Sequence, residues 1–254
     1  MDNNKNKMDY NDPFFSFENQ MKRIKDMRYK HSHVLKNKLN IKSEYKLNVI
    51  EDKLVKAKLV KLLINKENTL DTAKLDSEED KITFLKNINK FIYDDLYPFA
   101  GKIRTENFLS SIEDGANEYV ATKNMEDFEK QFDLVFSRFN KDYYKYCSYE
   151  EQVLLLSMNM SKLWSMQPFY KGNAISTVLF TQQFAERELG LDLDLNKLMQ
   201  HDLTDLFVRA NNEDIDSLVD AVSKSISNPH KYDKIFDETS MIEQDETQDE
   251  QQAL

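Results

Sequence analysis

The sequence reads Met166-Gln167-Pro168-Phe169-Tyr170-Lys171-Gly172-Asn173-Ala174-Ile175-Ser176 between two segments that have helical spacing. The first segment spans about residues 149–166 and the second about 175–190. Backbone N–H groups near Gly172 and Asn173 are therefore expected at the N-terminus of a helix, where anions bind well. This pattern is typical of a loop that holds a phosphate.

Two further stretches accompany the loop. One reads Phe91-Ile92-Tyr93-Asp94-Asp95-Leu96-Tyr97-Pro98-Phe99-Ala100-Gly101-Lys102-Ile103-Arg104-Thr105. The other reads Val34-Leu35-Lys36-Asn37-Lys38-Leu39-Asn40-Ile41, followed by Leu47 and Glu51. In the same order, the three stretches resemble motifs of the Fic (fido) family: Leu-Lys-Asn-Lys-Leu-Gly-Ile, Tyr-Pro-Phe/Trp-Ala-Gly-x-x-Arg, and His-Pro-Phe followed by two residues and Gly-Asn-Gly-Arg. The resemblance covers about residues 34–190.

The resemblance implies a mainly α-helical, Fic-type domain with a short β-hairpin flap. We expect this domain over residues 33–235, with the flap at about 103–120 and the signature loop at 167–175. Residues 1–32 would form an N-terminal arm. Residues 236–254 are expected to be an acidic, disordered tail, because seven acidic and no basic residues follow Lys234 and few apolar residues accompany them.

The departures from the signature fall on its reactive positions. In the family the His acts as a general base on a target hydroxyl, which then attacks the α-phosphate of ATP. Gln167 stands at this position, and an amide is neither basic nor acidic in the useful range. Loss of a general base commonly lowers the rate by about 10²–10⁴-fold. Gln167 could still orient a hydroxyl, or it could simply pack.

The other polar groups of the loop are also changed. Lys171 stands where the resemblance implies a carboxylate that holds Mg²⁺, so magnesium is not expected. The ammonium group could contact a phosphate directly or could remain solvated. Ile175 replaces the Arg that would clamp a polyphosphate, and Ala174 replaces a Gly. Phosphate-binding candidates are Lys171, Gly172, Asn173 and Ser176, and the ligand would be ATP or another nucleotide, if any.

The flap supplies the remaining candidates, Arg104, Thr105 and Asn107. We expect Arg104 to brace the fold near the flap rather than to react. The dipeptide Asp114-Gly115 favours a tight turn inside the hairpin.

Apolar spacing predicts the other helices. Residues 43–64, 81–96 and 125–139 each repeat apolar side chains every three or four positions. Pro98 is expected to end the second of these helices, because the residue before a proline avoids helical geometry. Gly190 is expected to cap the helix that follows the loop.

Composition limits the class of protein. The chain has 254 residues, 40% of them hydrophobic, with a single Cys, which excludes an internal disulfide. No cluster of Cys and His predicts a metal site, and no apolar run is long enough for a membrane span. We therefore expect a cytoplasmic protein that has no membrane contact.

Three functions fit the sequence, in this order. The first is a Fic-like protein with a degenerate active site, a catalytically impaired regulator or inhibitor that binds a protein partner through the flap and the loop. The second is an unconventional transferase that moves AMP, another nucleotide or a phosphate to a hydroxyl side chain of a target protein. The third is a nucleic-acid-binding module that uses residues 21–61, where thirteen basic residues face four acidic ones.

Overall fold

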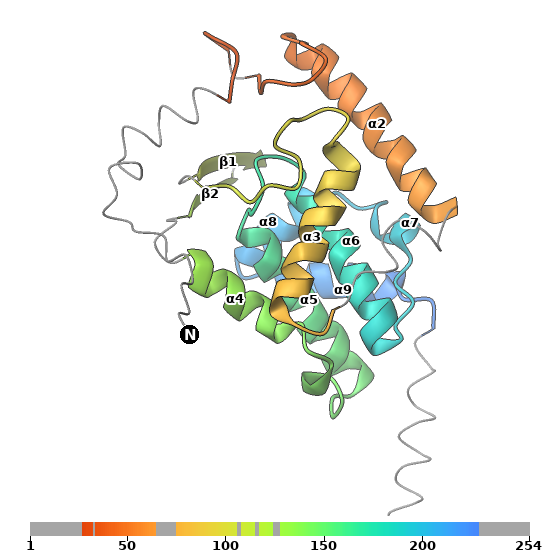
Figure 1. The fold of residues 1–254 in the computed structure, drawn as a ribbon. Helices are drawn as coiled ribbons and strands as arrows, with labels where there is room; N and C mark the ends of the chain where they lie inside the picture. The colour runs from red at the N-terminus through yellow and green to blue at the C-terminus, as the bar shows by residue number, and fades with distance from the viewer. Residues whose placement is uncertain are drawn as a thin grey trace, which may run out of the picture. The chain divides into compact units, whose positions relative to one another are not determined.

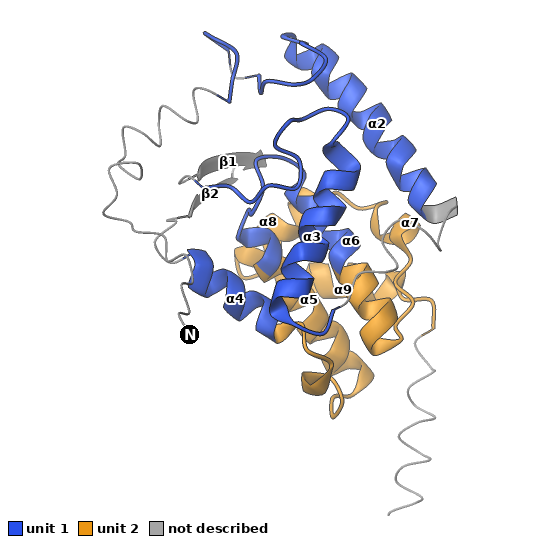
Figure 2. Ribbon diagram, viewed as in Figure 1, with its two compact units in different colours: residues 1–137, 163–180 blue, residues 138–162, 181–254 orange. Residues whose placement is uncertain are grey.

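The computed structural model describes residues 27–32, 34–64, 75–105, 108–114, 117–123 and 128–228. The described chain is mostly helical, which confirms the predicted mainly α class (Figure 1). Most of the expected N-terminal arm and the whole acidic tail lie outside the described residues. Two compact units divide the chain, Met1–Ser137 with Leu163–Phe180, and Arg138–Lys162 with Thr181–Leu254 (Figure 2). The single domain expected over 33–235 stays a prediction.

Unit 1 begins with α2 (Glu44–Ile64) and α3 (Glu78–Tyr93). Helix α3 starts three residues earlier than the apolar spacing predicts, because Ser77 and Asp80 form a capping box. The Ser77 hydroxyl accepts from the Asp80 N–H, and the Asp80 carboxylate accepts from the Ser77 N–H. The last helical residue, Tyr93, lies five positions before Pro98, which agrees with the predicted end.

The predicted hairpin is present. Strands β1 (Phe108–Asp114) and β2 (Asn117–Lys123) pair antiparallel, with Asp114 opposite Asn117. The chain just before the strands is held by the signature loop, because the Arg104 N–H donates to the carbonyl of Pro168 at 2.9 Å. The flap bounds of about 103–120 stay a prediction. Gly115, in the predicted turn, lies outside the described residues.

Aromatic side chains from α3, α4 (Phe128–Arg138) and α6 (Asn173–Phe184) form the core of unit 1. Phe180 lies between two other buried rings, with centroid distances of 6.1 Å to Phe84 and 5.4 Å to Phe136. Phe132 stands edge-on to Phe136 at 4.8 Å. This core fixes the start of α6, which is the helix that carries the signature loop at its N-terminus.

Among the described residues, unit 2 holds most of α5 (Tyr149–Ser165), the end of α6, a π-helical turn and four shorter helices. The shorter helices are the 3₁₀ turn η2 (Lys141–Tyr143), α7 (Leu195–Leu198), α8 (Leu203–Asn211) and α9 (Ile215–Ser225). After α6 the helix widens into a π-helical turn, η3 (Ala185–Leu189), and Gly190 caps it with φ of +66°. The Gly190 cap was predicted from the sequence. Tyr144 is buried in this unit, and its hydroxyl oxygen accepts from Asn159 Nδ2 at 2.8 Å.

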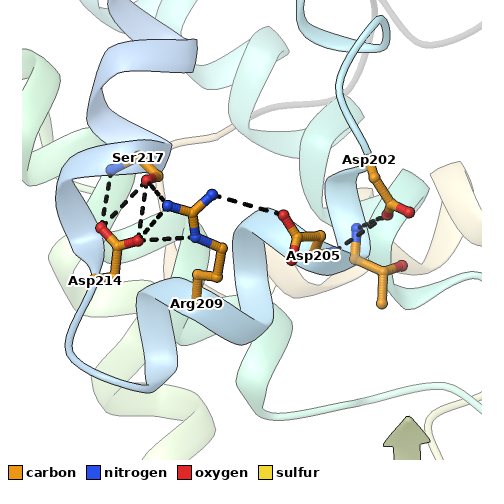
Figure 3. A network of polar contacts seen from close by, with 6 residues as sticks. Asp202, Asp205, Arg209, Asp214 and Ser217 are labelled. Carbon is orange, nitrogen blue, oxygen red and sulfur yellow. Dashed lines mark hydrogen bonds and ion pairs between the residues drawn. The ribbon is translucent and has the colours of Figure 1, made fainter. Parts of the chain in front are cut away.

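The turn between α8 and α9 is closed by a polar network (Figure 3). The Arg209 guanidinium donates to Asp214 Oδ2 from Nε at 2.8 Å and from Nη2 at 2.5 Å. Ser217 Oγ also contacts Asp214, and Asp205 lies on the other side of the guanidinium. The hydrogen bonds from Arg209 and then from Ser217 lower the pKa of Asp214. This network joins two helices at their exposed ends.

Candidate functional site

The signature loop lies entirely in unit 1 and connects α5 to α6. At its start Gln167 has φ of +45°, in the left-handed region that residues other than glycine rarely adopt. Its backbone N–H donates to the carbonyl of Trp164 at 3.0 Å, and its side-chain Nε2 donates to the same carbonyl at 2.9 Å. Gln167 is buried. It therefore ends α5 instead of extending into solvent.

The Asn173 side chain holds the loop closed. Its Nδ2 donates to Gln167 Oε1 at 2.9 Å and to the carbonyl of Phe169 at 2.8 Å. Its Oδ1 accepts from the Phe169 N–H at 2.8 Å. The amides of Gln167 and Asn173 thus satisfy each other and the nearby backbone. Neither side chain presents a free basic group for proton transfer.

Gly172 is required by two features of the loop. Its φ is +79°, which an L side chain adopts only with strain. A Cβ placed on Gly172 would also lie 2.0 Å from Cε2 of Tyr93. The tyrosine ring therefore packs directly on the glycine, and the loop backbone passes close to the end of α3.

Lys171 makes an ion pair with a residue that the sequence analysis did not place at the site. Its Nζ lies 3.1 Å from Glu51 Oε1, and Glu51 comes from the middle of α2. The hydroxyl of Tyr97 donates to the other carboxylate oxygen, Oε2, at 2.5 Å. Burial raises the pKa of both Tyr93 and Tyr97, and the charge of Glu51 raises them further. Both tyrosines therefore remain neutral hydrogen-bonding groups across the physiological pH range.

Asn89 of α3 is a second site residue that sequence reasoning missed. Its buried Nδ2 donates to the carbonyl of Lys171 at 2.9 Å and to Ser176 Oγ at 3.1 Å. Its Oδ1 accepts from the Gly101 N–H at 2.8 Å. One amide thus joins the signature loop to the Ala100-Gly101 turn. The only signal in the sequence was that Asn89 lies next to the apolar face of a predicted helix. This position does not by itself show that the side chain belongs to a functional site.

Arg104 has the bracing geometry that the sequence analysis expected. Its side chain is fully buried, and it donates from Nε to the carbonyl of Gln167 at 2.7 Å and from Nη2 to the carbonyl of Met166 at 3.2 Å. The guanidinium also lies over the Phe128 ring at 4.9 Å. These contacts satisfy the carbonyl groups at the end of α5 and stabilise the unusual backbone at Gln167.

The remaining sequence candidates lie in different surroundings. Ala174 lies in the first turn of α6, and its φ is not positive, so a side chain causes no backbone strain there. Ile175 and Ser176 are buried in the first turn of α6, and the Ser176 hydroxyl accepts from Asn89. The backbone N–H of Thr105 lies 3.5 Å from the Tyr170 hydroxyl. Asn107 lies outside the described residues.

The site is lined on one side by aromatic rings. Tyr97 stacks on Phe99 with a centroid distance of 5.0 Å, and Phe99 meets Tyr170 edge-on at 5.4 Å. These rings lie next to the Glu51–Lys171 pair because Tyr97 itself binds Glu51. The loop and the turn after α3 therefore form one connected structure.

The side chains of the loop do not fit a magnesium-bound triphosphate. At position 171 the chain offers an ammonium group, which repels Mg²⁺, and at position 175 an alkyl group with no donor. Among the described side chains, no group of three His, Cys, Asp or Glu residues gathers as metal ligands would. None of the described helices is both long and apolar enough to cross a membrane.

Comparison with known proteins supports the fold. No family model matches the sequence, and no curated protein matches it either. Solved structures do match. BepC of Bartonella tribocorum, a VirB-translocated effector protein with bound AMPPNP, is 19% identical with a TM-score of 0.61, over 78% of this chain and 96% of that chain.

Two further solved structures give the same result. The N-terminal FIC domain of Bep8 from Bartonella sp. 1-1C is 21% identical with a TM-score of 0.60, over 82% of this chain and 97% of that chain. The N-terminal Fic domain of a VirB-translocated Bep effector from Bartonella quintana, with bound ADP, is 17% identical with a TM-score of 0.63, over 79% and 94%. This chain has the fold of Fic domains, which confirms the fold predicted from the three motifs.

Proposed function

We propose that this Fic-like protein does not transfer nucleotides efficiently and acts by binding a protein partner, as a regulator or inhibitor. The partner would contact the flap and the signature loop. The observation that carries this proposal is the closed set of contacts within the loop. Gln167 and Asn173 bind each other and the backbone, and Lys171 is paired with Glu51.

Two physical arguments support a loss of catalysis. A general base must accept a proton near neutral pH, and the Gln167 amide does not. A phosphate clamp needs donors that face the ligand, whereas Ile175 has none and Lys171 donates to a carboxylate. The loop keeps its backbone form through Gly172, Asn89 and Arg104. Such a loop is suited to holding a fixed surface rather than to turning over a substrate.

The alternative is an unconventional transferase of AMP, another nucleotide or a phosphate. It is favoured by the start of α6, where a helix N-terminus follows the glycine at φ of +79°. Two proteins of the same fold were crystallised with AMPPNP and with ADP. We infer that nucleotide binding, without magnesium, is the part of this activity that the loop is best able to retain.

Binding to nucleic acid through residues 21–61 stays a prediction. Three lysines of this segment are paired with carboxylates: Lys38 with Asp94 at 3.0 Å, Lys56 with Asp52 at 2.9 Å, and Lys58 with Asp95 at 2.7 Å. These pairs reduce the positive charge that the segment would offer to phosphates, so this function ranks last.

The test is calorimetric titration of the full chain with ATP, ADP and AMP, with and without Mg²⁺, together with mass spectrometry for a transferred group. Asn173→Ala and Lys171→Met are the loop variants, and Asn196→Ala, an exposed residue of α7, is the control. We expect no transfer product and at most weak binding. A transfer product that both loop variants abolish would overturn the proposal in favour of the transferase.

The partner is tested separately by chemical crosslinking in cells, followed by mass spectrometry of the crosslinked peptides. We expect crosslinks from the flap lysine Lys123 and from Lys171 to one protein, which Asn173→Ala weakens and Asn196→Ala does not. If Asn173→Ala leaves the amount of crosslinked product unchanged, the partner binds elsewhere on the chain.

A further inference from the structure

The carboxylate of Glu51 joins α2 to the signature loop through two contacts. Oε1 pairs with Lys171 Nζ at 3.1 Å, and Oε2 accepts from the Tyr97 hydroxyl at 2.5 Å. The Glu51 side chain is 12% exposed, whereas the Lys171 side chain is 38% exposed. The carboxylate is therefore nearly buried, and the ammonium group remains within reach of solvent.

Lys171 is the only charged residue of the signature loop, residues 167–175. Because Glu51 balances this charge, the loop has no net charge to attract an anion. An anion that binds Lys171 must therefore compete with a carboxylate that is already in place. The competition is intramolecular, so Glu51 acts at a high effective concentration.

Among the described residues, α2 also contacts α3, where Lys58 Nζ lies 5.1 Å from the centre of the Phe91 ring. Among the side chains of α2 that the structure describes, Leu47 and Leu59 are the buried apolar ones, and Lys58 pairs with Asp95 just after α3. Tyr45, Val49 and Val60 are exposed, as are most of the charged side chains of α2. If Lys171 leaves Glu51, a nearly buried carboxylate loses its counter-ion, which weakens the hold on α2.

We propose that Glu51 is a built-in competitor for Lys171, so that an anion at the signature loop must displace Glu51 and thereby loosens α2. By thermodynamic linkage, whatever detaches α2 also frees Lys171 for an anion. The competitor comes from α2, outside the signature loop and the turn after α3, and it acts on Lys171, the charged residue of this loop. The inference rests on the proposed function, in which this loop is not held ready for nucleotide transfer.

The test uses inorganic pyrophosphate as the probe, titrated into the full chain and followed by ³¹P NMR. Glu51→Gln removes the charge but keeps an oxygen that accepts from Tyr97, so the fold is expected to survive. Asp52→Asn is the matched control: it removes the same charge from the neighbouring exposed residue, which pairs with Lys56 instead of facing the loop. Lys171→Met is combined with each variant.

We expect Glu51→Gln to bind pyrophosphate roughly fivefold tighter than wild type, the scale of a partly exposed ion pair. Asp52→Asn is expected to gain less than half as much, and the gain of Glu51→Gln is expected to vanish with Lys171→Met. Equal gains in Glu51→Gln and Asp52→Asn, or a gain that persists without Lys171, would overturn the proposal, because either result assigns the effect to overall charge.

A second measurement follows α2 itself. Trypsin is expected to cleave wild-type α2 faster when pyrophosphate is present, since Lys53, Lys56 and Lys61 are exposed on a loosened helix. In Lys171→Met the probe should not change this rate, and an equal acceleration there would contradict the coupling. These outcomes are separate from the transfer assay: a transfer product from wild type refutes the proposed function, whereas an unchanged affinity in Glu51→Gln refutes only this inference.

Discussion

At the scale of single residues, the loop depends on backbone positions that would be unfavourable alone. Gln167 adopts a left-handed φ, which costs on the order of 1 kcal/mol for a residue with a side chain. Arg104 and Asn173 hold it there through the backbone carbonyl and the side-chain oxygen. Gln167, which the sequence analysis compared with the family's His, thus fixes the junction between α5 and the loop.

Gly172→Ala is expected to destabilise the protein by about 3 kcal/mol or more, since left-handed strain costs about 1–2 kcal/mol and the Tyr93 ring occupies the place of the new methyl group. Urea unfolding measures the change. Gly190→Ala is the matched control, because Gly190 also has a positive φ. Equal losses of stability in the two variants would mean that the Tyr93 ring can move away from the new methyl group without destabilising the protein.

Asn89→Asp is expected to cost about 2–4 kcal/mol, because the aspartate cannot donate to the Lys171 carbonyl and brings a buried charge. The measurement is again the free energy of unfolding. Asn48→Asp makes the same change on an exposed position of α2 and should stay within about 0.5 kcal/mol of wild type. A small effect at Asn89 would show that Ser176 and Gly101 find other partners.

At the scale of elements, side chains at helix ends decide where the helices begin and how they are joined. Ser77 starts α3, Asp194 starts α7 and Asp202 starts α8, each by accepting from backbone N–H groups of the first turn. Ser77→Ala is expected to lower stability by about 1 kcal/mol, and Ser77→Gly by only a few tenths, as measured by urea unfolding. No loss in Ser77→Ala would argue against the capping box.

The Arg209–Asp214 contact predicts a dependence of stability on pH. The pKa of Asp214 is lower in the folded chain than its value of about 3.9 in an unfolded one. The contact therefore stabilises the protein above about pH 4, and this contribution is lost as the pH falls through the folded pKa. Thermal midpoints between pH 6 and pH 3 should fall less in Arg209→Met than in wild type.

Lys224→Met, which also removes one exposed positive charge, is the control for that experiment. If both variants flatten the pH curve equally, the effect comes from net charge and not from the contact with Asp214. Stability should still depend on pH in every variant, because the hydrogen bond with Lys38 also lowers the pKa of Asp94.

Elements were more predictable from sequence than contacts were. The periodic apolar residues of 81–96 and 149–166 predicted α3 and α5 within a few positions, and Gly190 predicted the end of the helical run. The π-helical turn at Ala185–Leu189 was not predicted, because it leaves the apolar pattern unchanged. Glu51 and Asn89 were missed as site residues because their partners lie far away in the sequence, where periodicity carries no information.

At the scale of the whole molecule, two helices contribute to both compact units. The boundary between the units falls within α5, after Lys162, and within α6, after Phe180. We expect a single cooperative unfolding transition, because neither unit can unfold without disrupting helices that the other needs. Fluorescence of Trp164, the single tryptophan, and far-ultraviolet circular dichroism should give the same midpoint. Separate midpoints would show that each half-helix is stable alone.

Asn89, which joins the signature loop to the Ala100-Gly101 turn, also makes the opening of the loop measurable. The Gly101 N–H donates to Asn89 Oδ1, and the same side chain binds the Lys171 carbonyl. The buried amide proton of Gly101 exchanges with water slowly while this hydrogen bond is formed. Its rate of hydrogen–deuterium exchange should therefore report how often the signature loop opens, although Gly101 lies far from the loop in the sequence.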